Sequence, residues 1–502
     1  MNHLFMQKPL FSANKIANSS PISFSVMTEF IKHRWLEFTP LSRDEKLIVS
    51  SISFTFLFYL VGALYLVAPV IGWGLLSVVI LRWSTGEILS AKNTKWLIIL
   101  WCFGAIVLEF ALIIGHLDFN LGFAKIIKSS IGWAKGWALL SIFVVLGYTL
   151  KIRYQAVCRA ACIVGLIAIL VTPFLVGSYI LSLPDTLYVS PLKVLGGSGP
   201  EFFTVRLYEI DPSNGQPRWR YFAPWAPAVG FVANIYLMCA WFDKSRMWRV
   251  IGVTGNALMI VLAASRMGML VLLFVPIAVW GLSRLTRTWV LICIAISLLV
   301  LASFFDPIFD TLNTIVGDIK SARADSTRVR ASLGNIALYR WQSEAYWFGH
   351  GVVETGTHLV EFMPIGSHHN WYGLLFVKGM VGFLGFLIPF ALTTIVLLIK
   401  AQYQVSSRLG LGMCLVLSCF SMSENIEALA YMTWPAWLLI GIGIRDSIDD
   451  IDSYKPNLLG QFRLLSERFN TQTKQMSTAE RTASSAFNEK LDQPQSSVGG
   501  QA

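Results

Sequence analysis

The run LIVSSISFTFLFYLVGALYLVAPVIGWGLLSVVIL occupies residues 47–81 and contains no charged residue. A transmembrane helix needs about 20 predominantly apolar residues to cross the hydrocarbon core, so this run is too long for one span. Pro69 and Gly72 favour a tight break inside the run. The sequence therefore predicts a hairpin of two membrane helices here, and similar apolar runs recur along the chain.

The composition points to the same class of protein. Of the 502 residues, 55% are hydrophobic and only 14% are charged, whereas a soluble protein carries about 25% charged residues. We therefore predict an all-α polytopic membrane protein of about 12 transmembrane helices, with a large external (periplasmic) loop between the ninth and tenth spans. The expected spans are the hairpin at 47–81 and segments at about 96–115, 136–150, 160–182, 223–242, 250–264, 267–283, 288–305, 371–398, 409–423 and 430–444.

The positive charge has a topological explanation. The chain has a net charge of +11, and most of its Lys and Arg residues fall in the N-terminal segment, the short connections and the tail. This is the positive-inside pattern, so we expect both termini in the cytoplasm and no nucleic-acid partner. The predicted parts are a cytoplasmic segment at 1–46, a transmembrane domain at 47–446 with external loops at about 183–222 and 306–370, and a largely disordered tail at 447–502.

Arg266 interrupts two apolar runs in ALMIVLAASRMGMLVLLFV. A charged side chain at the edge of a membrane span is costly unless it faces a polar cavity or an anion. The alternative is a long side chain that reaches the interface without a further role. We interpret Arg266 as an anion-binding residue.

Arg328 and Arg330 lie in the second long loop, within DSTRVR at 325–330. Their i, i+2 spacing puts them on different faces of a helix, so a site that one reaches is out of reach of the other. The planar guanidinium fork can donate two parallel hydrogen bonds to a phosphate. Arginines that converge from different segments could hold a diphosphate without a metal ion, although a solvated loop is the alternative.

His368 and His369 stand where the polar loop passes into an apolar helix. A neutral imidazole can orient a hydroxyl or accept its proton, whereas the alternative is a loop histidine with no role. Four of the seven histidines lie between residues 350 and 369, which raises the question of a metal. No carboxylate or cysteine joins them at ligand spacing apart from Glu354 and Glu361, so no metal and no cofactor are expected.

Three segments in this order resemble the O-antigen ligase and O-antigen polymerase superfamily of bacterial polytopic membrane glycosyltransferases. SRMG at 265–268 resembles a turn between two spans in that family. DSTRVR at 325–330, followed by FGHG at 348–351, resembles its Arg-bearing external loop. GSHHNWYGLLFVKGMVG at 366–382 resembles its His-containing entry to a late helix.

This resemblance implies a metal-independent glycosyltransferase of the bacterial inner membrane whose active site faces the periplasm. The donor would be a glycan linked to a polyprenyl diphosphate, and the acceptor a second glycan or lipid A–core. Arg266 and one of Arg328 or Arg330 would hold the diphosphate, and His368, or alternatively His369, would act on the acceptor hydroxyl. Membrane lipid and a chain-length regulator are the further partners that it implies.

We favour a polymerase for capsule, exopolysaccharide or O-antigen, because FAPWAP at 222–227 and DSTRVR look polymerase-like. An O-antigen ligase shares the same site and stays open. The competing class is a transporter or flippase of lipid-linked sugars, which places charges near the middle of the membrane in broken helices. Here the candidate residues gather at one face, which favours surface chemistry.

Overall fold

The computed structural model describes residues 41–86, 94–195, 199–211, 215–307, 309–311, 313–314, 324–355, 364–365 and 369–445. The tail predicted at 447–502 and nearly all of the predicted N-terminal segment lie outside these residues. The segment's last residues belong to a helix that begins at Arg43, so the first helix starts earlier than the apolar run suggested.

The described chain is mostly helical. Five stretches are long and apolar enough to cross a membrane, namely α4, α5, α8, α15 and the continuous run of α6 and α7, and a bent pair after α11 would make a sixth. Three further apolar helices, α9, α11 and α16, are shorter. The total of about 12 spans stays a prediction.

The main helices are α2 (Arg43–Ser53), α3 (Thr55–Val61), α4 (Leu64–Ser84), α5 (Lys95–Asp118), α6 (Phe123–Lys135), α7 (Trp137–Thr149), α8 (Tyr154–Ile180), α9 (Ala226–Trp241), α10 (Arg246–Leu262), α11 (Arg266–Leu282), α12 (Thr288–Ser303), α14 (Ala324–Glu344), α15 (Asn370–Ala401), α16 (Val405–Phe420) and α17 (Ala430–Arg445).

The hairpin of two membrane helices predicted in residues 47–81 stays a prediction, because α4 is the candidate membrane span that the described residues give there, and α2 and α3 are shorter helices. The break between α3 and α4 lies at Gly62, whose φ of 71° is left-handed and suits glycine. A Cβ at this position would lie 2.3 Å from the Cβ of Ser190. Pro69 and Gly72 instead lie inside α4. A proline is tolerated within a membrane helix because neighbouring groups can satisfy the freed carbonyl.

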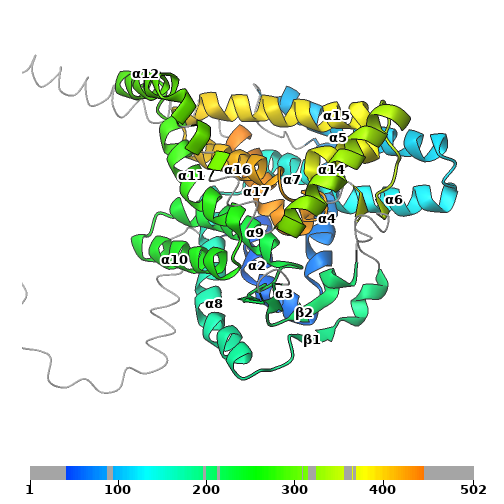
Figure 1. The fold of residues 1–502 in the computed structure, drawn as a ribbon, viewed down its shortest axis with the longest axis horizontal. Helices are drawn as coiled ribbons and strands as arrows, with labels where there is room; N and C mark the ends of the chain where they lie inside the picture. Colours follow the sequence, from blue (N-terminus) through cyan, green and yellow to red (C-terminus); the bar gives the residue numbers. More distant parts are fainter. Residues whose placement is uncertain are drawn as a thin grey trace, which may run out of the picture.

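The centre of the bundle is formed by α7 and α17, whose residues are buried almost throughout. Glycines bring the two backbones together: a Cβ at Gly147 would lie 2.0 Å from the carbonyl oxygen of Leu438, and one at Gly441 would lie 2.1 Å from that of Val144. Close approach through small residues is typical of membrane helices. In Figure 1, α15 and α5 pack together along one side of this centre, whereas α8, α9 and α10 cover the other.

The helix ends define two ends of the bundle. At the first, which we call the basic end, ion pairs fasten one helix end to another. Arg82 pairs with Asp44 at 2.9 Å, and the buried Arg159 pairs with Asp243, also at 2.9 Å. The opposite end, which we call the loop-rich end, carries the small strands, the first residues of α9 and α15, and the turn between α16 and α17.

The two predicted loops contain regular structure. The first holds an antiparallel pair, β1 (Thr186–Val189) with β2 (Thr204–Arg206), and a second pair, β3 (Glu209–Ile210) with β4 (Pro217–Arg218). The second holds β5 (Glu354–Thr355) paired with β6 (Pro364–Ile365), and also the whole of α14. Val329, Leu333 and Ala337 of α14 pack against Phe376 of α15, so this helix lies on the bundle.

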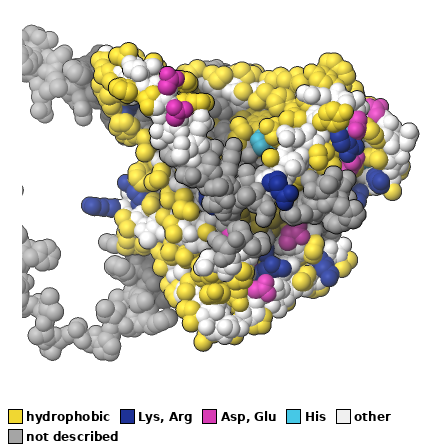
Figure 2. Space-filling model, viewed as in Figure 1, with side chains coloured by type: hydrophobic (Ala, Val, Ile, Leu, Met, Phe, Trp, Pro, Cys, Tyr) yellow, Lys and Arg dark blue, Asp and Glu magenta, His cyan; other side chains and the backbone are white. Residues whose placement is uncertain are grey.

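The outer surface fits a membrane environment. Figure 2 shows hydrophobic side chains over much of the described part of one face, with charged side chains in few places. Leu81, Phe174 and Ile277 are each more than 60% exposed. Large contiguous apolar surfaces are rare on soluble monomers, and apolar spans of this length are typical of lipid-facing helices.

Candidate functional site

The turn between α16 and α17, residues 421–429, is the meeting point of the candidate residues, and we call it the α16–α17 turn. Three hydrogen bonds hold the start of α15 against it. The backbone N–H of Asn370 donates to the carbonyl of Ser421 at 3.1 Å. The indole N–H of Trp371 donates to Oγ of Ser421 at 2.9 Å, and the N–H of Ile426 donates to Oδ1 of Asn370 at 3.3 Å.

His369 is the N-cap of α15. The N–H of Tyr372 donates to its Nδ1 at 3.5 Å, and the two rings stack with centroids 4.0 Å apart. Burial lowers the pKa of His369, so the neutral ring is favoured. Because Nδ1 accepts the capping bond, the ring proton is assigned to Nε2. The imidazole can therefore donate from Nε2 to an oxygen of a ligand. His368, the preferred residue of the pair, lies outside the described residues.

Arg330 reaches the α16–α17 turn from α14. Its Nη1 donates to the carbonyl oxygen of Ser423 at 3.5 Å, and its side chain is exposed. Arg328 is also exposed, and the intervening Val329 is buried. The i, i+2 spacing thus separates the two arginines, and Arg330 contacts the turn.

Arg266 is the first residue of α11 and is exposed at the loop-rich end. The preceding Ser265 caps the helix, because its Oγ accepts from the N–H of Gly268 at 3.1 Å. Ser265 also packs on α9, where a Cβ at Gly230 would lie 2.5 Å from its Oγ. Because Ser265 packs on α9, Arg266 lies at the same end of the bundle as the other candidate residues.

The structure adds Glu424 of the α16–α17 turn to this group. Its side chain is buried, and its Oε2 accepts a hydrogen bond from the indole N–H of Trp225 at 3.0 Å. Burial raises the pKa of Glu424, while the charge of Arg330 and the bond from Trp225 oppose the shift. A carboxyl group with a raised pKa can exchange a proton closer to neutral pH. From the sequence alone, Glu424 could equally have been half of a structural ion pair.

A second buried charge lies behind the turn. Lys378 is 1% exposed, and its Nζ has no hydrogen-bond partner among the described residues; the same holds for Oε2 of Glu109. Burial raises the pKa of Glu427 in the α16–α17 turn, and the charge of Lys378 opposes that shift. Lys378 precedes Gly379, where the backbone of α15 leaves the helical conformation with φ 61°. Ionisable residues are costly in a membrane and mark polar regions of functional interest.

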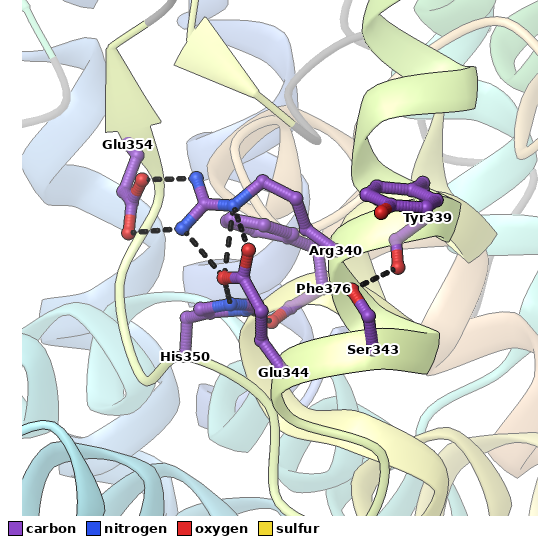
Figure 3. Close-up of polar contacts among 7 residues, drawn as sticks. All are labelled: Tyr339, Arg340, Ser343, Glu344, His350, Glu354 and Phe376. Atoms are coloured by element: carbon purple, nitrogen blue, oxygen red, sulfur yellow. Dashed lines mark hydrogen bonds and ion pairs between the residues drawn. The ribbon is translucent and has the colours of Figure 1, made fainter.

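The far end of α14 is held by four charged or polar side chains, which we call the α14 clamp: Arg340, Glu344, His350 and Glu354 (Figure 3). Arg340 pairs with Glu344 at 2.9 Å and with Glu354 at 2.5 Å. Nε2 of His350 lies 2.9 Å from Oε2 of Glu344, and its Nδ1 lies 3.1 Å from the carbonyl oxygen of Phe376. These contacts tie α14, β5 and the turn after α14 to α15.

Gly349 and Gly351 suggest from sequence a turn that lets the backbone approach a ligand. In the structure both have left-handed backbone conformations, and both approach other parts of the protein. A Cβ at Gly349 would lie 2.5 Å from the backbone nitrogen of Lys378, and one at Gly351 would lie 2.5 Å from Nδ1 of His116. These glycines therefore serve the packing of the turn on α15 and α5.

A buried charge cluster that sequence reasoning missed stiffens the approach to α9. Arg218 pairs with Glu209 at 2.7 Å and with Asp211 at 3.1 Å, and Arg220 lies 3.6 Å from Glu209. Arg220 also donates to the carbonyl of Ala223 at 3.3 Å. The cluster fixes the segment that delivers Trp225 to Glu424. A signal was present in the sequence, since two acidic and two basic residues lie within twelve positions.

Among the residues that the structure describes, no group of three or more His, Cys, Asp or Glu side chains could hold a metal ion. The chain was compared with known proteins. No family model matches it, and no curated protein matches it.

Proposed function

We propose that the protein is a membrane glycan transferase that moves a glycan from a polyprenyl diphosphate carrier onto an acceptor glycan, and that it acts as a polymerase. The observation that supports this most is the grouping of Arg330, His369 and Glu424 at the α16–α17 turn. One exposed cation, one imidazole N–H and one buried carboxyl group with a raised pKa border the same turn. The resemblance to the ligase and polymerase superfamily adds the substrate class.

The transfer needs a cation for the diphosphate, a proton acceptor for the hydroxyl, and a site that holds the acceptor hydroxyl close to the anomeric carbon of the donor. The acceptor hydroxyl loses its proton to a base, its oxygen bonds to the anomeric carbon, and the carbon–oxygen bond to the diphosphate breaks. Preorganised positive charge stabilises the leaving diphosphate. Arg330 supplies that charge at the turn, and Arg266 and Arg328 are further cations for the same anion. The proton goes to His368 or to Glu424, while His369 donates from Nε2 to a substrate oxygen.

The proposed orientation follows from charge. The basic end would face the cytoplasm by the positive-inside rule, so the loop-rich end would face the periplasm of a bacterial inner membrane. The count of about 12 spans and the placement of 306–370 as an external loop belong to this proposal. A ligase that uses lipid A–core as its acceptor would need the same site.

One observation favours a second candidate, a transporter of lipid-linked sugars. The backbone of α15 is broken at Gly379, next to the buried Lys378. Broken helices beside buried charges are typical of transporter binding sites. A transporter would carry the lipid-linked donor across the membrane without consuming it.

A gel of glycan chain lengths separates these functions. Cells that depend on this protein would carry the wild type, His368→Ala or His369→Ala, with equal amounts of protein in the membrane. A polymerase predicts single repeat units in the variant that lacks the catalytic histidine, whereas a ligase predicts unattached polymer. Normal ladders in both histidine variants would contradict the proposed role of this pair, and lipid-linked sugar trapped in the inner leaflet would favour transport.

A further inference from the structure

A groove of about 380 Å³ lies between α2, α3 and α8, next to the β1–β2 pair at the loop-rich end. Its volume is within the range of roughly 300–1,000 Å³ that is typical of small-molecule sites. Its lining is almost entirely apolar. The apolar lining residues include Phe54, Leu57, Leu60, Val171, Phe174 and Leu187.

The groove opens to the outer surface of the bundle. Leu57 and Leu60 of α3 are 52% and 54% exposed, and Phe174 of α8 is 61% exposed. Because α8 is long and apolar enough to cross a membrane, these side chains would face the bilayer when the protein is embedded in it. The surrounding medium therefore offers a hydrocarbon chain as the natural occupant.

One end of the groove carries a cation. Arg206, the last residue of β2, is among the lining residues. Its Nε is buried and has no hydrogen-bond partner among the described residues, and its Nη1 lies 3.8 Å from Oδ2 of Asp185, which is long for an ion pair. The hydroxyl of Tyr59 accepts from the backbone N–H of Arg206 at 2.8 Å and donates to its carbonyl at 3.1 Å. The position of this arginine is thus fixed by α3.

We propose that the groove binds one acyl chain of an anionic phospholipid, with the lipid phosphate on Arg206. An apolar slot that opens to the bilayer fits the chain, and a guanidinium at its end fits the phosphate. A polyprenyl chain is longer than an acyl chain, so only part of it could lie in a groove of this volume. The bound lipid would join α3, α8 and the β1–β2 pair, which otherwise leave a hollow between them.

The test measures lipid retention by the full-length protein in detergent, with native mass spectrometry and added phosphatidylglycerol or phosphatidylcholine. Val171→Trp fills the groove, and Arg206→Gln removes the cation. Leu273→Trp is the matched control, because Leu273 is 68% exposed on α11, outside the groove. We expect the wild type and the control to retain one phosphatidylglycerol, and Val171→Trp to lose it. In Arg206→Gln, the ratio of retained phosphatidylglycerol to retained phosphatidylcholine should fall at least tenfold.

Equal retention by the wild type and both groove variants would overturn the proposal. It would also be overturned if polyprenyl phosphate displaced phosphatidylglycerol from the wild type and this competition vanished in Val171→Trp, because the carrier would then be the occupant. Thermal unfolding of each variant checks folding. If Val171→Trp does not fold, Arg206→Gln still decides whether the groove selects an anionic head. None of these readouts depends on glycan transfer.

Discussion

The two ends of α14 differ in how their arginines are held. At one end Arg340 contacts two carboxylates, and Glu344 also contacts His350, so that the guanidinium is enclosed by the protein itself. At the other end Arg330 is exposed. Within the described residues its hydrogen bond goes to a backbone carbonyl at 3.5 Å, and its charge also acts on the carboxyl group of Glu424. The same residue type, ten positions apart in one helix, thus meets opposite surroundings.

This difference separates structure from function. A guanidinium that is already saturated by carboxylates serves to fasten helices, as the pairs at the basic end do. A guanidinium such as that of Arg330, whose hydrogen bond within the described residues is one long bond to a backbone carbonyl, keeps most of its donors for an anion. The clamp therefore positions α14, and the open end of α14 presents Arg330 to the α16–α17 turn.

The largest effect should come from the open end. Arg330→Ala should lower glycan transfer by about 10²–10³-fold, the usual cost of losing one preorganised electrostatic donor. Stability should change little, because the side chain is exposed. The measurement is the glycan ladder from cells with matched protein levels. Arg328→Ala is the paired variant, and an equal loss in both would erase the distinction between the two arginines.

The second effect concerns the packing behind the clamp. Gly379→Ala should destabilise the protein by about 2 kcal/mol, because left-handed backbone strains an alanine. Its Cβ would also lie 2.3 Å from the carbonyl oxygen of Trp347. Thermal unfolding in detergent measures the loss. Gly281→Ala is the control, since nothing lies within 4 Å of a Cβ there; the same melting temperature in both variants would contradict the packing.

A smaller effect is expected at the clamp itself. Arg340→Ala should reduce stability by about 1 kcal/mol, because the network is partly exposed and solvent screens it. Arg340 is 25% exposed and Glu344 is 40% exposed. Transfer should fall much less than in Arg330→Ala. If Arg340→Ala abolished transfer without any loss of stability, the clamp would belong to the site.

The smallest effect is a pH dependence. Burial raises the pKa of Glu424, so the folded state binds this proton more tightly than the unfolded state. Stability therefore falls as pH rises from the ordinary glutamate pKa through the raised folded value. Glu424→Gln keeps a hydrogen-bond acceptor for Trp225 but has no carboxyl group to titrate. The free energy of unfolding of this variant should therefore vary less with pH than that of the wild type. Unfolding curves between pH 4 and pH 8 compare the two proteins, and parallel curves would contradict a raised pKa.

Some of these features were readable from the sequence. Long apolar runs predicted a helical membrane protein, and the structure contains helices that could span a bilayer. The Ser265–Arg266 step predicted a break between two helices, and α10 ends at Leu262 while α11 begins at Arg266. These features are local, because hydrophobic periodicity and helix caps act over a few residues.

Other features depend on contacts between distant positions. Glu424 bonds to Trp225, which lies 199 residues earlier, so its burial left no local signal. The polar sequence of α14 read as a loop, because only a narrow face formed by Val329, Leu333 and Ala337 packs on the bundle. The break predicted near Pro69 was misplaced, because the helix ends at Gly62 while Pro69 is tolerated inside α4.

The most direct test of the account uses the purified protein in liposomes with a lipid-linked donor extracted from cells that lack the protein. The amounts of intact donor, elongated glycan and released polyprenyl diphosphate are measured for the wild type, Arg330→Ala and Arg340→Ala. We predict that the wild type and Arg340→Ala consume the donor and release polyprenyl diphosphate, whereas Arg330→Ala leaves it intact. Intact donor that only changes leaflet, or wild-type consumption by Arg330→Ala, would contradict the account.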